Sequence, residues 1–79
     1  MSPTILREGP YRFFFFSQDV HEPPHIHVER DDSVAKFWLN PVNLVTSSGF
    51  SGRELRIVER IVRRHAVEFR EAWNEHFSE

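Results

Sequence analysis

The chain has 79 residues, which is enough for one small domain and too few for two. Apolar residues make up 39% and charged residues 28%, a balance typical of folded globular proteins rather than disordered ones. The absence of cysteine excludes disulfide-stabilised secreted mini-proteins, thiolate metal sites and cysteine nucleophiles, and the net charge of −2 argues against a protein that mainly coats nucleic acid. We therefore expect a single domain over residues 1–79.

The sequence has neither a membrane helix nor a secretory signal pattern. The longest apolar run, residues 13–16, is far shorter than the about 20 residues that span a bilayer. The N-terminal stretch 1–4 lacks a basic segment followed by an apolar one. We therefore expect a cytoplasmic protein with no membrane partner.

The N-terminal part of the chain predicts a β-hairpin. Residues 4–7 are β-prone, residues 8–10 contain turn formers, and residues 11–16 form an aromatic-rich strand. Residues 17–24 are expected to be a loop, and its two final prolines restrict how the chain enters the next strand.

Residues 25–30 and 34–39 predict a second hairpin, because their apolar and polar side chains alternate with the period of a half-buried strand. Residues 31–33 between them are types that tolerate tight turns. A two-residue turn gives a register that pairs His25 with Trp38, Ile26 with Phe37, His27 with Lys36, and Val28 with Ala35.

The C-terminal part predicts a long helix. Ser51 as N-cap with Glu54 three residues later makes a capping box, and Phe50 can pack on Leu55 as a hydrophobic staple. Apolar residues then recur to Phe77, mostly at intervals of three and four positions. An unbroken helix to that point would be about 39 Å long, against about 20 Å for a strand. The helix must therefore bend, split near residues 63–65, or extend beyond the sheet and use its second half against a partner.

Together these elements predict an α+β fold. We expect a small antiparallel sheet of three to four strands, arranged as two hairpins, followed by one long C-terminal helix, bent or split, that packs on one face. Residues 42–46 fit either a short edge strand or a helical turn, because five residues are too few for periodicity to distinguish the two.

The strand alternation separates an apolar face, which the helix covers, from a mixed face that stays open. Phe14 and Phe16 add aromatic surface to this open face. Exposed apolar patches of this kind mark partner interfaces or binding sites. The candidate binding residues on the open face are Arg12, His25, His27, Lys36 and Trp38.

His25 and His27 are the sharpest motif, because residues i and i+2 of a strand present two imidazoles on one face. With Glu29 as a carboxylate, and His21 within reach from the loop, they would suit zinc or nonhaem iron. Lys36 opposite His27 argues against a cation there, so we expect no cofactor and keep a divalent metal at His25 and His27 as the alternative.

The same imidazoles allow two other interpretations. Beside Lys36 and Arg12 they could bind a phosphate and move its proton, as a metal-independent ribonuclease would require. The simpler interpretation, which we favour over both chemical ones, is that the imidazoles are structural polar groups on a half-exposed strand or in an oligomer contact. The sequence leaves open whether the protein is an enzyme.

Arginines on the predicted helix form a stripe opposite its apolar side. The candidate nucleic-acid contacts are Arg53, Arg56, Arg60 and Arg63. Glutamates nearby on the same helix suggest an ordinary solvated face as the simpler interpretation.

The sequence contains five segments that together resemble one known family: Pro3-Thr4-Ile5-Leu6-Arg7, Tyr11-Arg12-Phe13-Phe14-Phe15, Glu22-Pro23-Pro24-His25-Ile26-His27-Val28, Ala35-Lys36-Phe37-Trp38-Leu39, and the stretch from Gly49-Phe50-Ser51 to Ala72-Trp73-Asn74-Glu75. They resemble the bacterial domain of unknown function 4160 family over almost the whole chain. The resemblance implies a small bacterial or phage cytoplasmic protein, often encoded beside another small domain in a two-gene arrangement like a toxin-antitoxin pair. It supplies no catalytic residues to transfer.

The leading hypothesis from the sequence is a protein-interaction component of such a toxin-antitoxin-like module. Its partner would be a second copy of the chain, in a homo-oligomer, or the small protein encoded nearby. The alternatives are a small nuclease or metal-binding hydrolase that uses His25 and His27, and a nucleic-acid binder that uses the helix arginines.

Overall fold

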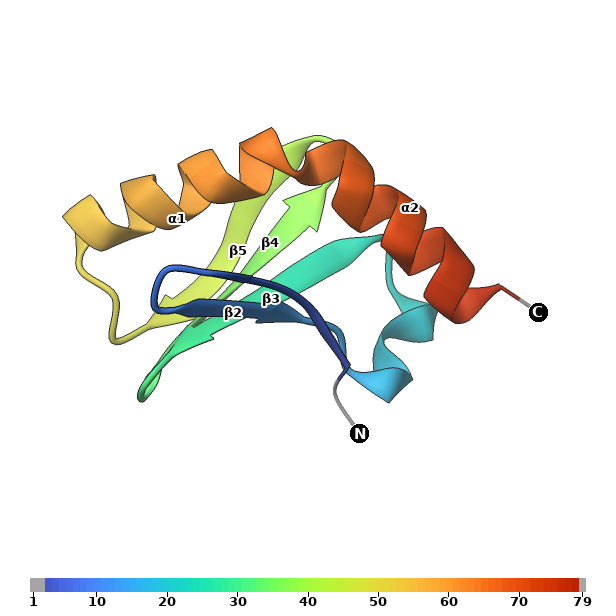
Figure 1. Ribbon diagram of the computed structural model, residues 1–79, viewed down its shortest axis with the longest axis horizontal. Coiled ribbons are helices and arrows are strands. Elements are labelled where there is room, and N and C mark those ends of the chain that lie inside the picture. Colours follow the sequence, from blue (N-terminus) through green and yellow to red (C-terminus); the bar gives the residue numbers. More distant parts are fainter. Residues whose placement is uncertain (1–2, 79) are drawn as a thin grey trace.

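The computed structural model describes residues 3–78, in which a sheet and a helical layer face each other (Figure 1). The five antiparallel strands lie in chain order: β1 (Thr4–Glu8), β2 (Tyr11–Phe14), β3 (His25–Arg30), β4 (Ser33–Leu39) and β5 (Val42–Ser48). A short 3-10 helix, η1 (Ser17–His21), joins β2 to β3, and two helices follow β5: α1 (Gly52–Arg64) and α2 (Ala66–Phe77). Figure 1 shows both α-helices over the same face of the sheet.

The α+β class is confirmed, and the predicted elements need three corrections. The sheet has five strands where three to four were expected, because β5 is a full strand over residues 42–48. The strand expected over residues 11–16 ends at Phe14, and the loop expected over residues 17–24 contains η1. Met1, Ser2 and Glu79, which belong to the expected domain over residues 1–79, lie outside the described residues.

The predicted register of the second hairpin is confirmed. Ile26 lies opposite Phe37 and His27 opposite Lys36, with the turn at Asp31 in a positive-φ conformation of 53°. The register of β4 against β5 shifts between Lys36 and Phe37.

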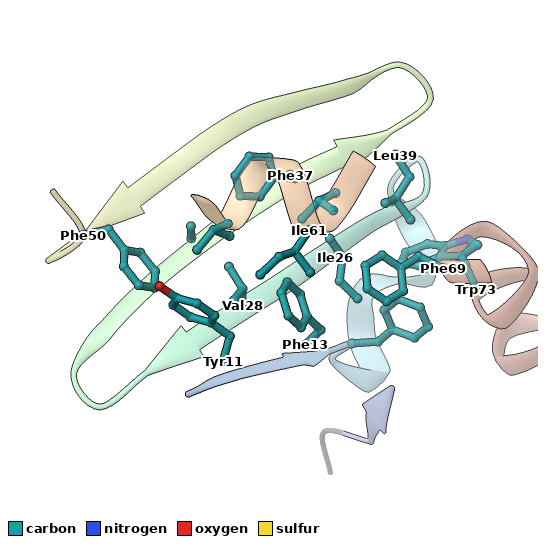
Figure 2. Packing of buried hydrophobic residues seen from close by; sticks show 14 residues of the cluster. Tyr11, Phe13, Ile26, Val28, Phe37, Leu39, Phe50, Ile61, Phe69 and Trp73 are labelled. Atoms are coloured by element: carbon teal, nitrogen blue, oxygen red, sulfur yellow. The ribbon is translucent and has the colours of Figure 1, made fainter. Parts of the chain in front are cut away.

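The core lies between the sheet and the helices, where the strand alternation and the helical stripe meet (Figure 2). Phe13, Ile26 and Phe37 project from the sheet and are fully buried, and Val62 and Phe69 meet them from the helices. Burying each such side chain stabilises the fold by about 1.5–3 kcal/mol. The alternation of β3 and β4 therefore decides which face the helices cover.

The long predicted helix is split in two at His65, within the stretch 63–65 where the sequence allowed a split. His65 has φ −107° and ψ 14°, so it is not helical. Its two ring nitrogens lie 3.1 Å from a Glu8 carboxylate oxygen and 2.9 Å from one of Glu68. The contact with Glu8 holds the junction of α1 and α2 against β1. Because the chain changes direction at this junction, the two helices can follow the sheet although one straight helix would be longer than its strands. Within residues 3–78, neither helix combines the length and apolar character needed to cross a bilayer.

Of the two hydrogen bonds of the predicted capping box at the N-terminus of α1, the structure forms the one that Ser51 accepts. The Glu54 backbone N–H donates to the Ser51 hydroxyl at 3.1 Å. The Glu54 carboxylate accepts hydrogen bonds from the Tyr11 hydroxyl at 2.9 Å and from the Arg30 guanidinium, and so ties α1 to β2 and β3. The hydrogen bonds from Tyr11 and Arg30 lower the pKa of Glu54.

This lowered pKa predicts a pH-dependent contribution to stability. A carboxyl whose pKa is lowered on folding stabilises the fold above its unfolded pKa, and the contribution is lost as the pH falls through the folded pKa. We expect Glu54→Gln to unfold at lower urea concentration than the natural chain at neutral pH, with the difference narrowing in acid. Glu71→Gln, an exposed change on α2, is the control; equal midpoints for both variants at neutral pH would contradict the expectation.

Candidate functional site

The face of the sheet opposite the helices carries a hollow of about 300 Å³. Phe14 and Phe16 line it on one side, Val34 and residues 46–48 line it on the other, and His27 and Lys36 lie between. The hollow is therefore bounded by side chains from β2, β3, β4 and the edge strand β5. It is the open face that the strand alternation predicted.

His27 is the histidine that the open face presents. Its ring lies 4.6 Å from that of Phe16 and 5.4 Å from that of Phe14, measured between centroids. Its side chain is 16% exposed, and its Nε2 donates to Asp19 Oδ2 at 3.1 Å. Burial lowers the pKa of His27, which favours the neutral imidazole.

His25 differs from the expectation that both imidazoles face the open side. Its side chain is 0% exposed, and its ring lies 4.9 Å from that of Trp73 in α2 and 5.7 Å from that of Trp38. His25 is the first residue of β3, where the Pro23 carbonyl and the Trp73 ring of α2 lie against its imidazole. It is therefore enclosed and does not line the hollow.

Asp19 is the residue that joins the two histidines, and sequence reasoning missed it. Its Oδ2 accepts the Phe16 N–H at 2.8 Å, which turns η1 back toward β3, and it lies 3.1 Å from Nε2 of both His25 and His27. The three potential ligand atoms of Asp19, His25 and His27 all lie within 4.8 Å of one another. The only sequence signal for Asp19 was its position in the loop before the His-x-His motif. Its approach to the two imidazoles depends on the η1 turn, which the sequence did not predict.

The other two residues that the sequence suggested as metal ligands, Glu29 and His21, lie away from the two imidazoles. Glu29, expected as the carboxylate, is paired with Arg12 at 3.0 Å across β2 and β3. His21 is exposed on η1 and is not part of the cluster. The structure thus replaces Glu29 by Asp19 as the carboxylate beside the two imidazoles.

The remaining predicted binding residues lie on the open face but are already engaged. Lys36 Nζ pairs with Glu22 and lies 5.0 Å from the centroid of the Trp38 ring. The Arg12 guanidinium lies 4.4 Å from the centroid of the Phe14 ring. The cations on this face therefore have partners within the chain.

The arginine stripe lies on the solvent side of α1. Arg53, Arg56, Arg60 and Arg63 are all exposed. Arg63 pairs with Glu59 at 3.0 Å, which leaves Arg53, Arg56 and Arg60 without an ion pair among residues 3–78. The stripe is on the opposite side of the molecule from the hollow, because the helical layer separates them.

The contacts of Asp19 predict that it stabilises the site. Asp19→Ala would leave the Phe16 N–H and the His27 ring without their acceptor, at a cost of about 1–3 kcal/mol. Asp19→Asn keeps a carbonyl acceptor and should cost less. Urea unfolding monitored by tryptophan fluorescence measures both, with the exposed Gln18→Ala as the control; an Asp19→Ala midpoint equal to that of Gln18→Ala would contradict this role.

One family matches the chain, described as a domain of unknown function (DUF4160), over residues 11–74. No curated protein and no solved structure matches it. The matched range contains Asp19, the two imidazoles, the hollow and both α-helices up to Asn74. The chain therefore belongs to the domain of unknown function 4160 family.

Proposed function

We propose that the protein is the interaction component of a two-gene, toxin-antitoxin-like module and binds its partner through the hollow on the open face of the sheet. The observation that carries the proposal is the one-sided architecture. Five strands present two faces, and the helices cover only one of them (Figure 1).

The rim of the hollow exposes large apolar side chains. Phe16 is 43% exposed and Val34 is 44% exposed, on opposite sides of the hollow. Neither side chain belongs to the hydrophobic core, which lies on the opposite face of the sheet, beneath the helices. Apolar surface gathered around a concavity favours insertion of a partner side chain.

The polar groups around the hollow favour a protein partner over a charged small molecule. Arg12 is neutralised by Glu29, Lys36 by Glu22, and His27 is bonded to Asp19. An apolar centre with satisfied polar groups around it is the usual anatomy of a protein interface. The edge strand β5 forms one wall, and uncovered edge strands offer backbone groups to other chains.

The partner that fits this surface presents an apolar side chain flanked by neutral hydrogen-bonding groups. Thr46 and Ser48 are among the residues that line the hollow, and their hydroxyls can bind such groups. The two-gene arrangement implied by the family resemblance suggests the product of the adjacent small gene as this partner. A second copy of the chain could occupy the hollow instead, so the experiment must distinguish it from the product of the adjacent gene.

Val34→Glu tests the proposal, with Val67→Glu as a matched control. Both valines are exposed, at 44% and 58%, but Val67 lies on α2 away from the hollow. We expect Val34→Glu to weaken binding of the adjacent gene product at least about 10-fold, because docking would bury an unpaired carboxylate. Val67→Glu should leave the affinity unchanged. Titration of the purified partner measures both affinities.

Two results would contradict the proposal. One is equal weakening by the two substitutions, which would place the contact outside the hollow. The other is a chain that neither binds the adjacent gene product nor self-associates in sedimentation at high concentration. Self-association that Val34→Glu abolishes would identify a second copy of the chain as the occupant.

The burial of His25 argues against a metal-independent ribonuclease. General acid–base catalysis requires both groups within hydrogen-bond reach of the substrate. His27 lines the hollow, but His25 is fully enclosed beside Trp73. In this arrangement only one imidazole of the pair faces the hollow, which makes the ribonuclease the less favoured alternative.

Nucleic-acid binding by α1 is the second candidate function, favoured by the three arginines for which residues 3–78 supply no ion pair. Arg56 and Arg60 line a shallow depression of about 230 Å³ on the surface of α1. We expect the double variant Arg56→Ala, Arg60→Ala to lose affinity for a short RNA and to show a smaller salt slope, by about 2 if both contact phosphates. Fluorescence anisotropy at several salt concentrations measures this; an unchanged slope would contradict contact by these arginines.

A further inference from the structure

The buried imidazole of His25 has an unusual hydrogen-bonding state. Its Nδ1 lies 2.9 Å from the Pro23 carbonyl oxygen, which can only accept, so Nδ1 carries a proton. In the neutral ring Nε2 then carries a lone pair. Nε2 is buried and has no hydrogen-bond partner among the described residues.

The lone pair of Nε2 lies close to another acceptor. Asp19 Oδ2 is 3.1 Å away, and the contact lacks the alignment of a hydrogen bond. A buried acceptor held next to a carboxylate is unfavourable unless a positive charge lies near both. His27 Nε2 lies 3.1 Å from the same oxygen, so three donor atoms converge on one point.

We propose that Asp19, His25 and His27 bind a divalent first-row transition-metal ion such as Zn²⁺. The ion accepts the Nε2 lone pairs of both imidazoles and Oδ2 of the carboxylate. The proton of the His27 ring then resides on Nδ1, so its hydrogen bond to Asp19 is replaced by the bond to the metal. Three protein donors leave at least one coordination position for water.

The spacing of the donors suits such an ion. Tetrahedral bonds of about 2.0–2.1 Å separate neighbouring ligand atoms by about 3.3 Å. The carboxylate oxygen is 3.1 Å from each imidazole nitrogen, and all three atoms lie within 4.8 Å. Two imidazoles and one carboxylate favour zinc, iron or cobalt over magnesium and calcium, which prefer oxygen ligands throughout.

The groups behind the donors match those that support metal ligands elsewhere. A ligating histidine usually donates its other ring N–H to a carbonyl or carboxylate, as His25 does to Pro23. A ligating carboxylate is itself hydrogen-bonded, as Asp19 is by the Phe16 N–H. Pro23 and Phe16 thus orient two of the three ligands before any ion binds.

Neither access nor the neighbouring cation prevents binding. His27 lines the hollow on the open face, which gives an ion a route to the donors. Lys36, which the sequence placed opposite His27, is paired with Glu22 and lies over the Trp38 ring. Its charge is therefore already balanced by a carboxylate.

Calorimetric titration of the chelator-treated protein with Zn²⁺ tests the proposal. We expect one ion per chain, and His27→Gln and Asp19→Asn should each weaken the affinity by more than about 100-fold, because loss of even supporting groups costs 10–100-fold. His21→Gln is the matched control, since His21 is exposed on η1 outside the cluster and should leave the affinity unchanged.

Two further measurements keep the test independent of variant folding. Circular dichroism establishes that His27→Gln and Asp19→Asn are folded before they are titrated. Visible absorption of the natural chain with Co²⁺ should show the bands of a site with nitrogen and oxygen ligands, and Mg²⁺ should not displace the ion. A folded natural chain that does not bind Zn²⁺, or equal affinity in His27→Gln and His21→Gln, would overturn the proposal.

Discussion

The fold depends on the alternation of side chains along β3, the central strand of the sheet. Ile26 and Val28 enter the core beneath the helices, which obliges His27 and Glu29 to face the other way. A shift of one residue would exchange these sets and bury charge in place of hydrocarbon. The helices cover only one face of the sheet (Figure 1). The candidate site residues His27 and Lys36 therefore lie on the other face.

The short helix η1 turns that open face into a structured site. By turning back over the start of β3, η1 carries Asp19 to both imidazoles and helps to enclose His25. The exposure therefore changes within one motif: His25 is fully buried, and His27, two residues later, is partly exposed. The two histidines therefore differ in exposure, although each brings its Nε2 atom to within 3.1 Å of Asp19 Oδ2.

The sequence pattern predicted those features that depend on neighbouring residues alone. The register from His25 to Val28 followed from alternation and a tight turn, and the start of α1 followed from Ser51. Asp19 could not be found in this way, because its approach to His27 depends on the path of a loop with no periodicity. The same holds for β5, whose pairing with β4 includes a register shift that no repeating pattern reveals. Tertiary contacts, and not propensity, decided these features.

The break at His65 divides the helical layer into two parts that pack on different pairs of strands. α1 contacts β4 and β5 and carries the arginine stripe, whereas α2 contacts β3 and β4 and supports His25 through Trp73. Perturbations of the arginine surface and of the imidazole cluster should therefore be energetically additive, so that either surface can change in evolution without disturbing the other.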